Sequence, residues 1–163
     1  LGEGAFRDCS GLTSMTLPSG VTRVANSLFY YCSGLKSVTL PDTVTAIEMS
    51  AFSGCTALES IAIPSGVTSI GTYAFYHCEK LTEIALPSVL TTIGNKAFGY
   101  CKGLTSVVIP KSVTSVGEYI FEYCNYSLTI NCECKKADAT GWNKNWNAGS
   151  SGYTLKVVWE YVA

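Results

Sequence analysis

Residues 104–124 read LTSVVIPKSVTSVGEYIFEYC, and this stretch decides the fold because most of the chain repeats its pattern. The pattern returns as LESIAIPSGVTSIGTYAFYHC at 58–78 and as LTEIALPSVLTTIGNKAFGYC at 81–101. All six Phe, all five Pro and six of the eight Cys recur every 23 residues. The recurring Phe and Cys are Phe6, Phe29, Phe52, Phe75, Phe98, Phe121, Cys9, Cys32, Cys55, Cys78, Cys101 and Cys124. A period of this length predicts a solenoid or a similar repeat architecture.

The repeat divides the chain into an array and a tail. Residues 1–11 match the second half of a unit, and five full units follow at 12–34, 35–57, 58–80, 81–103 and 104–126. Since the array opens in the middle of a unit, we expect further coils or another domain upstream. We therefore expect a repeat domain at 1–126 and a capping segment at 127–163.

Within one unit, the apolar spacing changes along the chain. In 58–80, the alternation at 61–63 predicts a short strand, which Pro64 ends because proline has no N–H to donate to a sheet. The next bend turns two aliphatic residues of 67–70 inward, and the spacing of three and four in 71–78 predicts one or two helical turns. No single coil can bury its own apolar face, so the coils must stack. We expect an α/β solenoid with one short parallel sheet.

The three quoted strings resemble the BspA-type leucine-rich repeat, and the resemblance covers residues 1–126. It implies a leucine-rich-repeat solenoid from a secreted or cell-surface protein, typically of gut or oral bacteria. It further implies adhesion and protein binding without catalysis, and it names no ligand. The tail, with GWNKNWN and KVVWEYVA, is similar to the closing segment of such arrays.

The composition excludes several classes of function. The 163 residues suit one domain, and a net charge of −1 provides no basic field for nucleic acid. No apolar run reaches the roughly 20 residues of a membrane span, and no stretch reads as a signal peptide. One His leaves little scope for acid–base or zinc chemistry. We expect no enzyme activity, no cofactor and no metal.

The sequence offers three weak candidates for chemistry. The repeated Cys predict a reduced, buried ladder, because stacked coils hold these side chains parallel and a disulfide needs a near-perpendicular twist. Cys132 and Cys134 lie outside the period, and either a bridge to another Cys or packing under the cap suits them. His77 and Cys78 are adjacent on the expected helix and point apart, which argues against a catalytic pair. The recurring Thr predict a solvated or mutually bonded row.

The tyrosines are the best candidates for recognition. We call a position that recurs in every repeat unit a slot. The tyrosines fall around the Phe and Cys slots, at Tyr31, Tyr73, Tyr76, Tyr100, Tyr119 and Tyr123. Tyr is a common interface anchor, although it also covers the edge of a core while its hydroxyl stays in water. A second candidate is the strand face, where Lys36 and Glu59 share one slot.

The tail carries all three Trp, and two readings suit them. Trp142, Trp146 and Trp159 would close the exposed end of the core, or would form an aromatic platform for a sugar. Residues 127–132 predict a further strand, shifted by one residue from the repeat register.

Together these patterns predict a non-catalytic scaffold, extracellular or on a cell surface, that binds a protein, a host matrix ligand or a glycan. The alternative is a spacer or stalk within a larger surface protein, with binding done elsewhere.

Overall fold

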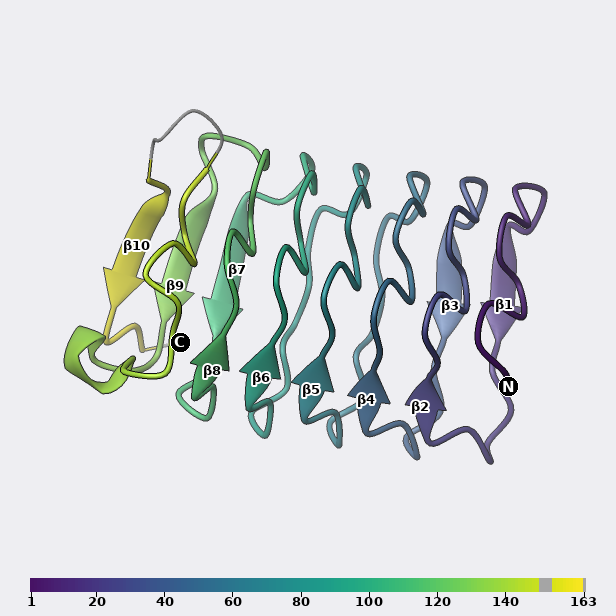
Figure 1. The fold of residues 1–163 in the computed structure, drawn as a ribbon, viewed down its shortest axis with the longest axis horizontal. Helices are drawn as coiled ribbons and strands as arrows, with labels where there is room; N and C mark the ends of the chain where they lie inside the picture. Colours follow the sequence, from purple (N-terminus) through teal and green to yellow (C-terminus); the bar gives the residue numbers. More distant parts are fainter. Residues whose placement is uncertain (150–153, 163) are drawn as a thin grey trace.

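The computed structural model describes residues 1–149 and 154–162. The chain winds into a parallel β-solenoid in which each 23-residue unit forms one coil (Figure 1). The predicted solenoid is confirmed. The α/β assignment is wrong, because the only helix of the described residues is the single 3-10 turn η1 at Lys136–Asp138.

A continuous five-stranded sheet runs along one side of the solenoid, where the sequence predicted only a bend. Its strands are β2 (Arg23–Val24), β4 (Ala46–Ile47), β5 (Ser69–Ile70), β6 (Thr92–Ile93) and β8 (Ser115–Val116). They pair in the order β2-β4-β5-β6-β8, as the lower edge of Figure 1 shows. Every pair is in register one repeat apart, for example Ile47 with Ile70. Each two-residue strand turns one aliphatic side chain into the core.

On the side where one continuous sheet was predicted, the pairing is interrupted. β1 (Ser14–Thr16) pairs with β3 (Ser37–Thr39), and β7 (Ser106–Ile109), β9 (Thr129–Cys132) and β10 (Lys156–Trp159) form a second group. Between the groups, residues 60–63 and 83–86 form no strand. Ile61 and Ile84 are nevertheless buried. The apolar alternation therefore reports which side chains enter the core, and it does not guarantee hydrogen-bonded pairing.

Residues 71–78 form a column of turns in place of the predicted helix. The N–H groups of Tyr73, Phe75 and His77 donate to carbonyls of the following coil at 2.8–2.9 Å. The residues between them donate to the carbonyl three positions earlier, at 3.1–3.2 Å. Tyr73 and His77 adopt left-handed φ angles of 58° and 60°. An α-helix needs every N–H for the carbonyl four residues back, so donors committed to the next coil exclude it.

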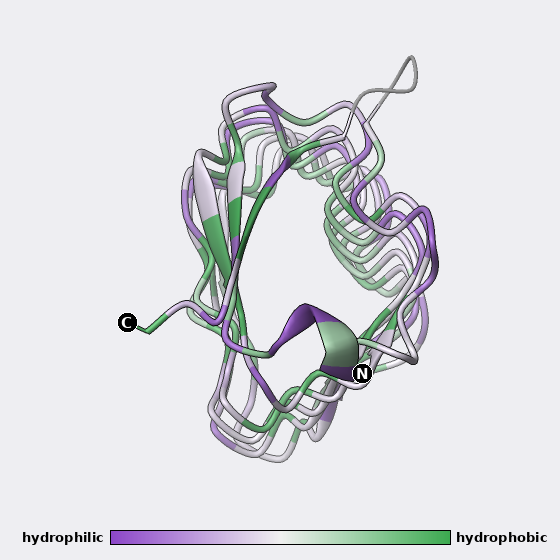
Figure 2. Ribbon diagram, turned by 90° about the vertical axis from the view of Figure 1, so that its left-hand side faces the viewer, coloured by the Kyte–Doolittle hydropathy of each residue, from purple (hydrophilic) through white to green (hydrophobic). Residues whose placement is uncertain are grey.

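The core is a column of phenylalanine rings. Five of them are fully buried, at Phe29, Phe52, Phe75, Phe98 and Phe121. Successive ring centroids lie 5.3–5.5 Å apart with interplanar angles of 6–18°. Phe6, in the first half coil, is partly buried against the same core. Viewed along the solenoid axis, the coils superimpose around this common interior (Figure 2). The 23-residue recurrence of Phe thus places equivalent rings in one column.

The cysteine ladder lies beside the rings and is reduced. From Cys32 to Cys124, each Sγ donates to the Phe carbonyl of the preceding coil at 2.8–3.3 Å. These thiols are buried, whereas Cys9 is exposed. Burial raises the pKa of the Cys124 thiol to about 12 and raises that of Cys78 well above its ordinary value. The thiols therefore stay protonated, as a hydrogen-bond donor must.

The tail continues the coil beyond the repeats. β9 pairs with β7 one full repeat apart, Thr129 opposite Ser106, so the predicted one-residue shift is wrong within the strand. The extra residue lies before the strand. The Leu128 N–H donates to the carbonyl three residues earlier, as the Leu104 N–H does, but Leu128 lies one residue beyond the position that the repeat predicts. Cys132 is buried, Cys134 is half-buried, and both are unbridged.

The three tryptophans pack together over the last coil. Trp142 and Trp146 are buried, and their ring centroids lie 5.7 and 6.0 Å from that of Trp159. Trp142 extends the five-stranded sheet by a bridge to Val116, and its Nε1 donates to the Val113 carbonyl at 3.1 Å. This burial favours a capping role over an exposed sugar platform. The boundary at residue 126 stays a prediction.

Replacing Phe75 by Ala should lower the free energy of unfolding by about 3–5 kcal/mol, because it leaves a cavity between two stacked rings. Urea denaturation measures the loss. Phe6→Ala is the matched control, and it should cost less because Phe6 is only partly buried. A loss below about 1 kcal/mol for Phe75→Ala would show that the ring column is not the core.

Deleting residues 127–163 should make the chain associate. Removal of β9 would leave β7 as an unpaired edge and expose the buried Val107 and Ile109. Light scattering should then report dimers or larger species. If the shortened chain is monomeric and equally stable, the tail is not a cap.

Candidate binding surface

One slot of the turn column carries the outward-facing aromatic residues. It is occupied in successive coils by Tyr31, Gly54, His77, Tyr100 and Tyr123, all with left-handed φ angles of 56–79°. Large residues adopt this conformation uncommonly. From Tyr31 to Tyr100, hydrogen bonds to the following coil hold it, as for the N–H groups of His77 and Tyr100 at 2.9 and 2.7 Å. The backbone therefore fixes where each ring leaves the surface.

Five rings on this side form one contiguous cluster. His77 stacks on Tyr100 with centroids 4.1 Å apart, and Tyr100 stacks on Tyr123 at 4.5 Å. Tyr76 meets His77 and Tyr100 edge-on at 4.8 and 5.2 Å, and Tyr73 meets Tyr76 edge-on at 5.1 Å. We call Tyr73, Tyr76, His77, Tyr100 and Tyr123 the aromatic ladder. It brings together four of the six predicted tyrosines.

The other two predicted tyrosines lie apart from these contacts. Tyr31 is 53% exposed and meets Tyr30 edge-on at 4.5 Å. A Cβ at Gly54 would lie 3.0 Å from the Tyr31 ring, so Gly54 gives this ring room and interrupts the row of aromatic side chains. Tyr119 is half-buried, and its hydroxyl accepts a 3.4 Å hydrogen bond from Asn145.

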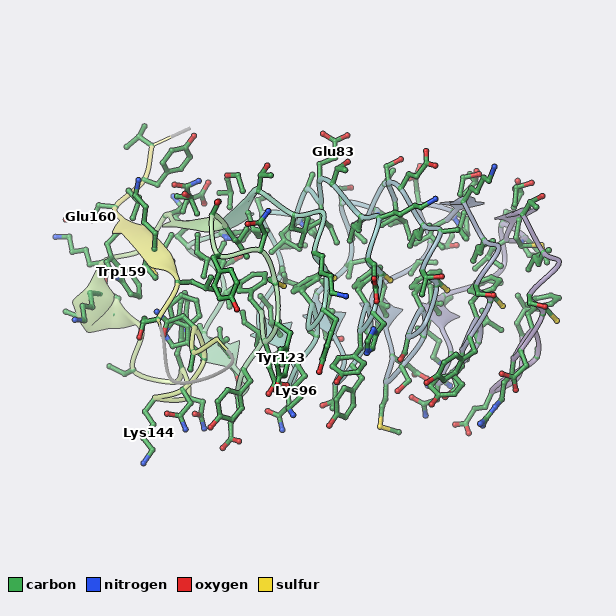
Figure 3. All side chains as sticks on the ribbon, turned by 90° about the horizontal axis from the view of Figure 1, so that it is seen from above. Glu83, Lys96, Tyr123, Lys144, Trp159 and Glu160 are labelled. Carbon is green, nitrogen blue, oxygen red and sulfur yellow. The ribbon has the colours of Figure 1, made fainter. Side chains whose placement is uncertain are left out.

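Lys36 and Glu59 are exposed on neighbouring coils of the interrupted side. Glu59 N–H donates a backbone hydrogen bond to the Lys36 carbonyl at 3.4 Å, and no ion pair joins the two side chains. In Figure 3, Glu83 of the interrupted side lies on the opposite side of the molecule from Lys96 of the turn column. The structure therefore separates this predicted pair from the aromatic ladder.

Ion pairs border the aromatic ladder. Glu79 lies 3.1 Å from His77 Nδ1 and 3.2 Å from Lys102 Nζ, and Lys96 Nζ lies 2.9 Å from Glu122. Hydrogen bonds from His77 and then Lys102 hold the pKa of Glu79 below its ordinary value. Burial raises the pKa of Tyr76 to about 12. The Tyr76 hydroxyl is therefore neutral. At the border of the aromatic ladder, acidic side chains are paired with basic ones.

His77 is the residue that sequence reasoning undervalued. From the sequence, His77 was considered only as half of a catalytic pair with Cys78. The structure gives the two side chains separate partners, because His77 contacts Glu79 while the Cys78 thiol donates to the Phe52 carbonyl at 3.3 Å. The signal was present, since His77 shares its slot with Tyr31 and Tyr100.

The remaining candidates for chemistry are structural. Thr45, Thr68, Thr91 and Thr114 each donate Oγ1 to the backbone carbonyl of the preceding Thr at 3.0–3.5 Å, so the predicted bonded row is confirmed. In the part of the chain that the structure describes, no three His, Cys, Asp or Glu residues gather where a metal ion would bind. Nor is any helix there long and apolar enough to cross a membrane.

Several hollows open on the surface of the described residues, and two of them are compared first. The larger, about 650 Å³, lies on the interrupted side over Ile61, Ala62, Ile84, Ala85 and Val108. The smaller, about 410 Å³, lies at the end of the aromatic ladder and is lined by Tyr100, Lys102, Tyr123, Cys124, Asn125 and Tyr126. The second adjoins two of the predicted tyrosines, and a further hollow of about 190 Å³ adjoins Trp142, Trp146 and Trp159 of the tail.

Comparison with known proteins identifies the repeat. The model of the BspA type leucine rich repeat region matches residues 1–127 in six copies, and no curated protein matches the chain. A leucine-rich repeat protein of T. pallidum is 34% identical over 74% of this chain and 58% of its own, with a TM-score of 0.69.

Two more distant structures share the fold. A leucine-rich repeat protein of Bacteroides ovatus is 22% identical over 98% of this chain and 54% of its own, with a TM-score of 0.57. The pneumococcal vaccine antigen PcpA is 18% identical over 91% of this chain and 42% of its own, with a TM-score of 0.67. The chain thus spans about half the length of the solved proteins it matches.

The ion pairs of Glu79 predict a pH dependence of stability. Because the folded-state pKa lies below the ordinary 4.5, the ionised carboxylate stabilises the fold above that pH, and the contribution is lost as pH falls through the folded value. The stability difference between wild type and Glu79→Gln should therefore be largest near neutral pH and shrink in acid. Urea midpoints measured across this range test it.

Glu83→Gln is the matched control, because the exposed Glu83 is in no ion pair of the described residues. A Glu79→Gln difference that stays constant with pH would contradict the assigned pairing.

Proposed function

Because this chain belongs to the family of BspA-type leucine-rich repeat proteins, we propose that it is a non-catalytic scaffold that binds a protein ligand outside the cell or on its surface. The observation that carries this proposal is the aromatic ladder. Its rings are contiguous, partly exposed and attached to a backbone whose N–H groups bond from coil to coil.

The aromatic ladder has the chemistry of an interface. Tyr offers a broad surface with an apolar ring and a polar tip, and it loses little conformational entropy when it is fixed. Here much of that entropy is already lost, because Tyr100 stacks on both His77 and Tyr123. A partner would therefore meet a surface that is ordered before binding, which lowers the cost of association.

The polar groups near the ladder also support binding over catalysis. A nucleophile needs a base within hydrogen-bond reach. The buried thiols donate to Phe carbonyls, the Thr row donates to backbone carbonyls, and His77 contacts Glu79. These side chains therefore stabilise the fold or make contacts at the border of the aromatic ladder.

The extracellular location rests on the family resemblance. The fold likeness to a pneumococcal vaccine antigen is consistent with it, although at 18% identity that likeness concerns the fold alone.

A spacer or stalk is the competing function, and a specific observation favours it. Tyr73, Tyr76 and Tyr100 are only partly exposed, which suits rings that cover the edge of a core while their hydroxyls stay in water. A pure spacer would keep these rings for stability and would bind nothing through them.

A binding screen separates the two functions. The intact chain is tested by biolayer interferometry against immobilised extracellular-matrix proteins and a glycan array. For a protein that binds, Tyr100→Ala should weaken affinity at least tenfold, as expected of an interface anchor. The matched control is the double variant Lys36→Ala/Glu59→Ala on the separate face, which should bind like wild type.

Circular dichroism and urea midpoints establish that Tyr100→Ala remains folded. If no protein binds, or if every ligand binds the Tyr100→Ala variant as tightly as wild type, the ladder is not the binding surface.

A further inference from the structure

On the interrupted side of the solenoid, the backbone hydrogen bonds between coils lengthen toward the middle of the array. The Lys36 N–H donates to the Thr13 carbonyl at 2.8 Å. In the next two coils the same bond is 3.3–3.4 Å long, from Glu59 to Lys36 and from Thr82 to Glu59. No described residue accepts a hydrogen bond from the Thr105 N–H. The pairing between coils is therefore weakest around the units at 58–80 and 81–103.

The two stretches of these units that form no strand leave their backbone groups unpaired. Within the described part of the chain, no N–H of 60–63 or 83–86 donates a backbone hydrogen bond, and no carbonyl of these residues accepts one. Leu86 is only half-buried, whereas Ile109, in the same slot of the next coil, is fully buried. Because a backbone N–H or C=O needs a partner, these groups remain available to solvent or to a ligand.

The hollow of about 650 Å³ opens over these two stretches, and we call it the central hollow. Ala62 and Ala85 form its floor. Their slot holds larger side chains in other coils, at Thr16, Thr39 and Val108. All lining residues lie between 60 and 108, so the central hollow lies inside the array, between the strands β3 and β7 in Figure 1. Its volume is within the roughly 300–1,000 Å³ that is usual for ligand pockets.

Glu83 is the one charged residue that lines the central hollow. It is exposed on the interrupted side, as Figure 3 shows, and it makes no ion pair with a described residue. A carboxylate beside an apolar floor complements a side chain that has an apolar stem and a cationic head. Arginine suits this arrangement best, because its guanidinium binds a carboxylate through two parallel hydrogen bonds.

We propose that the central hollow binds an extended peptide segment of a protein partner that carries an arginine. The arginine stem lies on Ala62 and Ala85, and the guanidinium pairs with Glu83. The unpaired N–H and C=O groups of 60–63 and 83–86 are the hydrogen-bonding partners for the peptide backbone. The inference goes beyond the proposed function, because the central hollow lies on the side of the molecule away from the aromatic ladder and does not depend on it.

The test uses blocked pentapeptides and the intact ¹⁵N-labelled chain. Titration with acetyl-Gly-Leu-Arg-Leu-Gly-amide should shift the backbone amide signals of Ala62, Ala85 and Val108. The same peptide with citrulline, the uncharged analogue of arginine, should bind at least about threefold more weakly, because the ion pair is lost.

Variants test the charged wall and the floor separately. Glu83→Gln should bind the arginine and citrulline peptides equally, because it removes the charge that distinguishes them. Glu59→Gln is the matched control, since Glu59 is exposed on the preceding coil and does not line the hollow, and it should keep the wild-type affinity. Ala85→Thr introduces the side chain that Thr39 has in the same slot. It should weaken binding of the arginine peptide at least about threefold, because the stem loses apolar contact.

Circular dichroism and urea midpoints establish that the variants remain folded. Equal binding of the arginine and citrulline peptides to the wild type overturns the proposal, and so does wild-type affinity in Ala85→Thr. If arginine amide alone binds as tightly as the peptide, the central hollow takes a small cation, which also overturns the peptide assignment. Shifts confined to Tyr100 and Tyr123 would place the peptide on the aromatic ladder instead.

The result is separable from the proposed function. A protein ligand that depends on Tyr100, together with no binding of the arginine peptide, would overturn this inference and leave the proposed function standing. Binding of the arginine peptide that depends on Glu83, with no ligand for the aromatic ladder, would support this inference and overturn the proposed function.

Discussion

The structure depends on how the backbone N–H groups of the turn column are divided between carbonyls of their own coil and carbonyls of the next coil. Alternate residues donate to the next coil, and the residues between them close turns within their own coil. This division holds successive coils one repeat apart, so residues in the same slot are brought into contact. The phenylalanine column, the thiol-to-carbonyl bonds and the threonine row follow from this single translation. Left-handed residues such as Tyr73 and His77 are the conformational cost of the arrangement.

The same translation builds the outer surface. A residue type that recurs in one outward slot becomes a row of stacked side chains, as His77, Tyr100 and Tyr123 show. A single departure interrupts the row, and Gly54 is such a departure. Which side chains the surface offers to a partner therefore depends on the slot and on the coil. The ends of rows differ from their interiors, because an end lacks the neighbour that every interior residue has.

The sequence contained most of the fold and part of the candidate surface. The period of Phe, Pro and Cys predicted stacking, and the buried column and reduced thiols confirm it. The six tyrosines were selected because they surround those slots, and four of them do meet in one cluster. Their part in binding stays a prediction. His77 was set aside because a lone histidine was weighed for catalysis, although its slot already placed it among tyrosines.

The sequence by itself determined which residues are equivalent, because the repeat shows directly which positions recur from one coil to the next. It did not determine what the backbone does between equivalent positions. Apolar spacing of three and four predicted a helix at 71–78, where donors to the neighbouring coil impose turns, and alternation at 61–63 predicted a strand that finds no pairing. Only the tertiary structure decided these points, because each N–H has one proton to donate, and the choice between its own coil and the next depends on where the next coil lies.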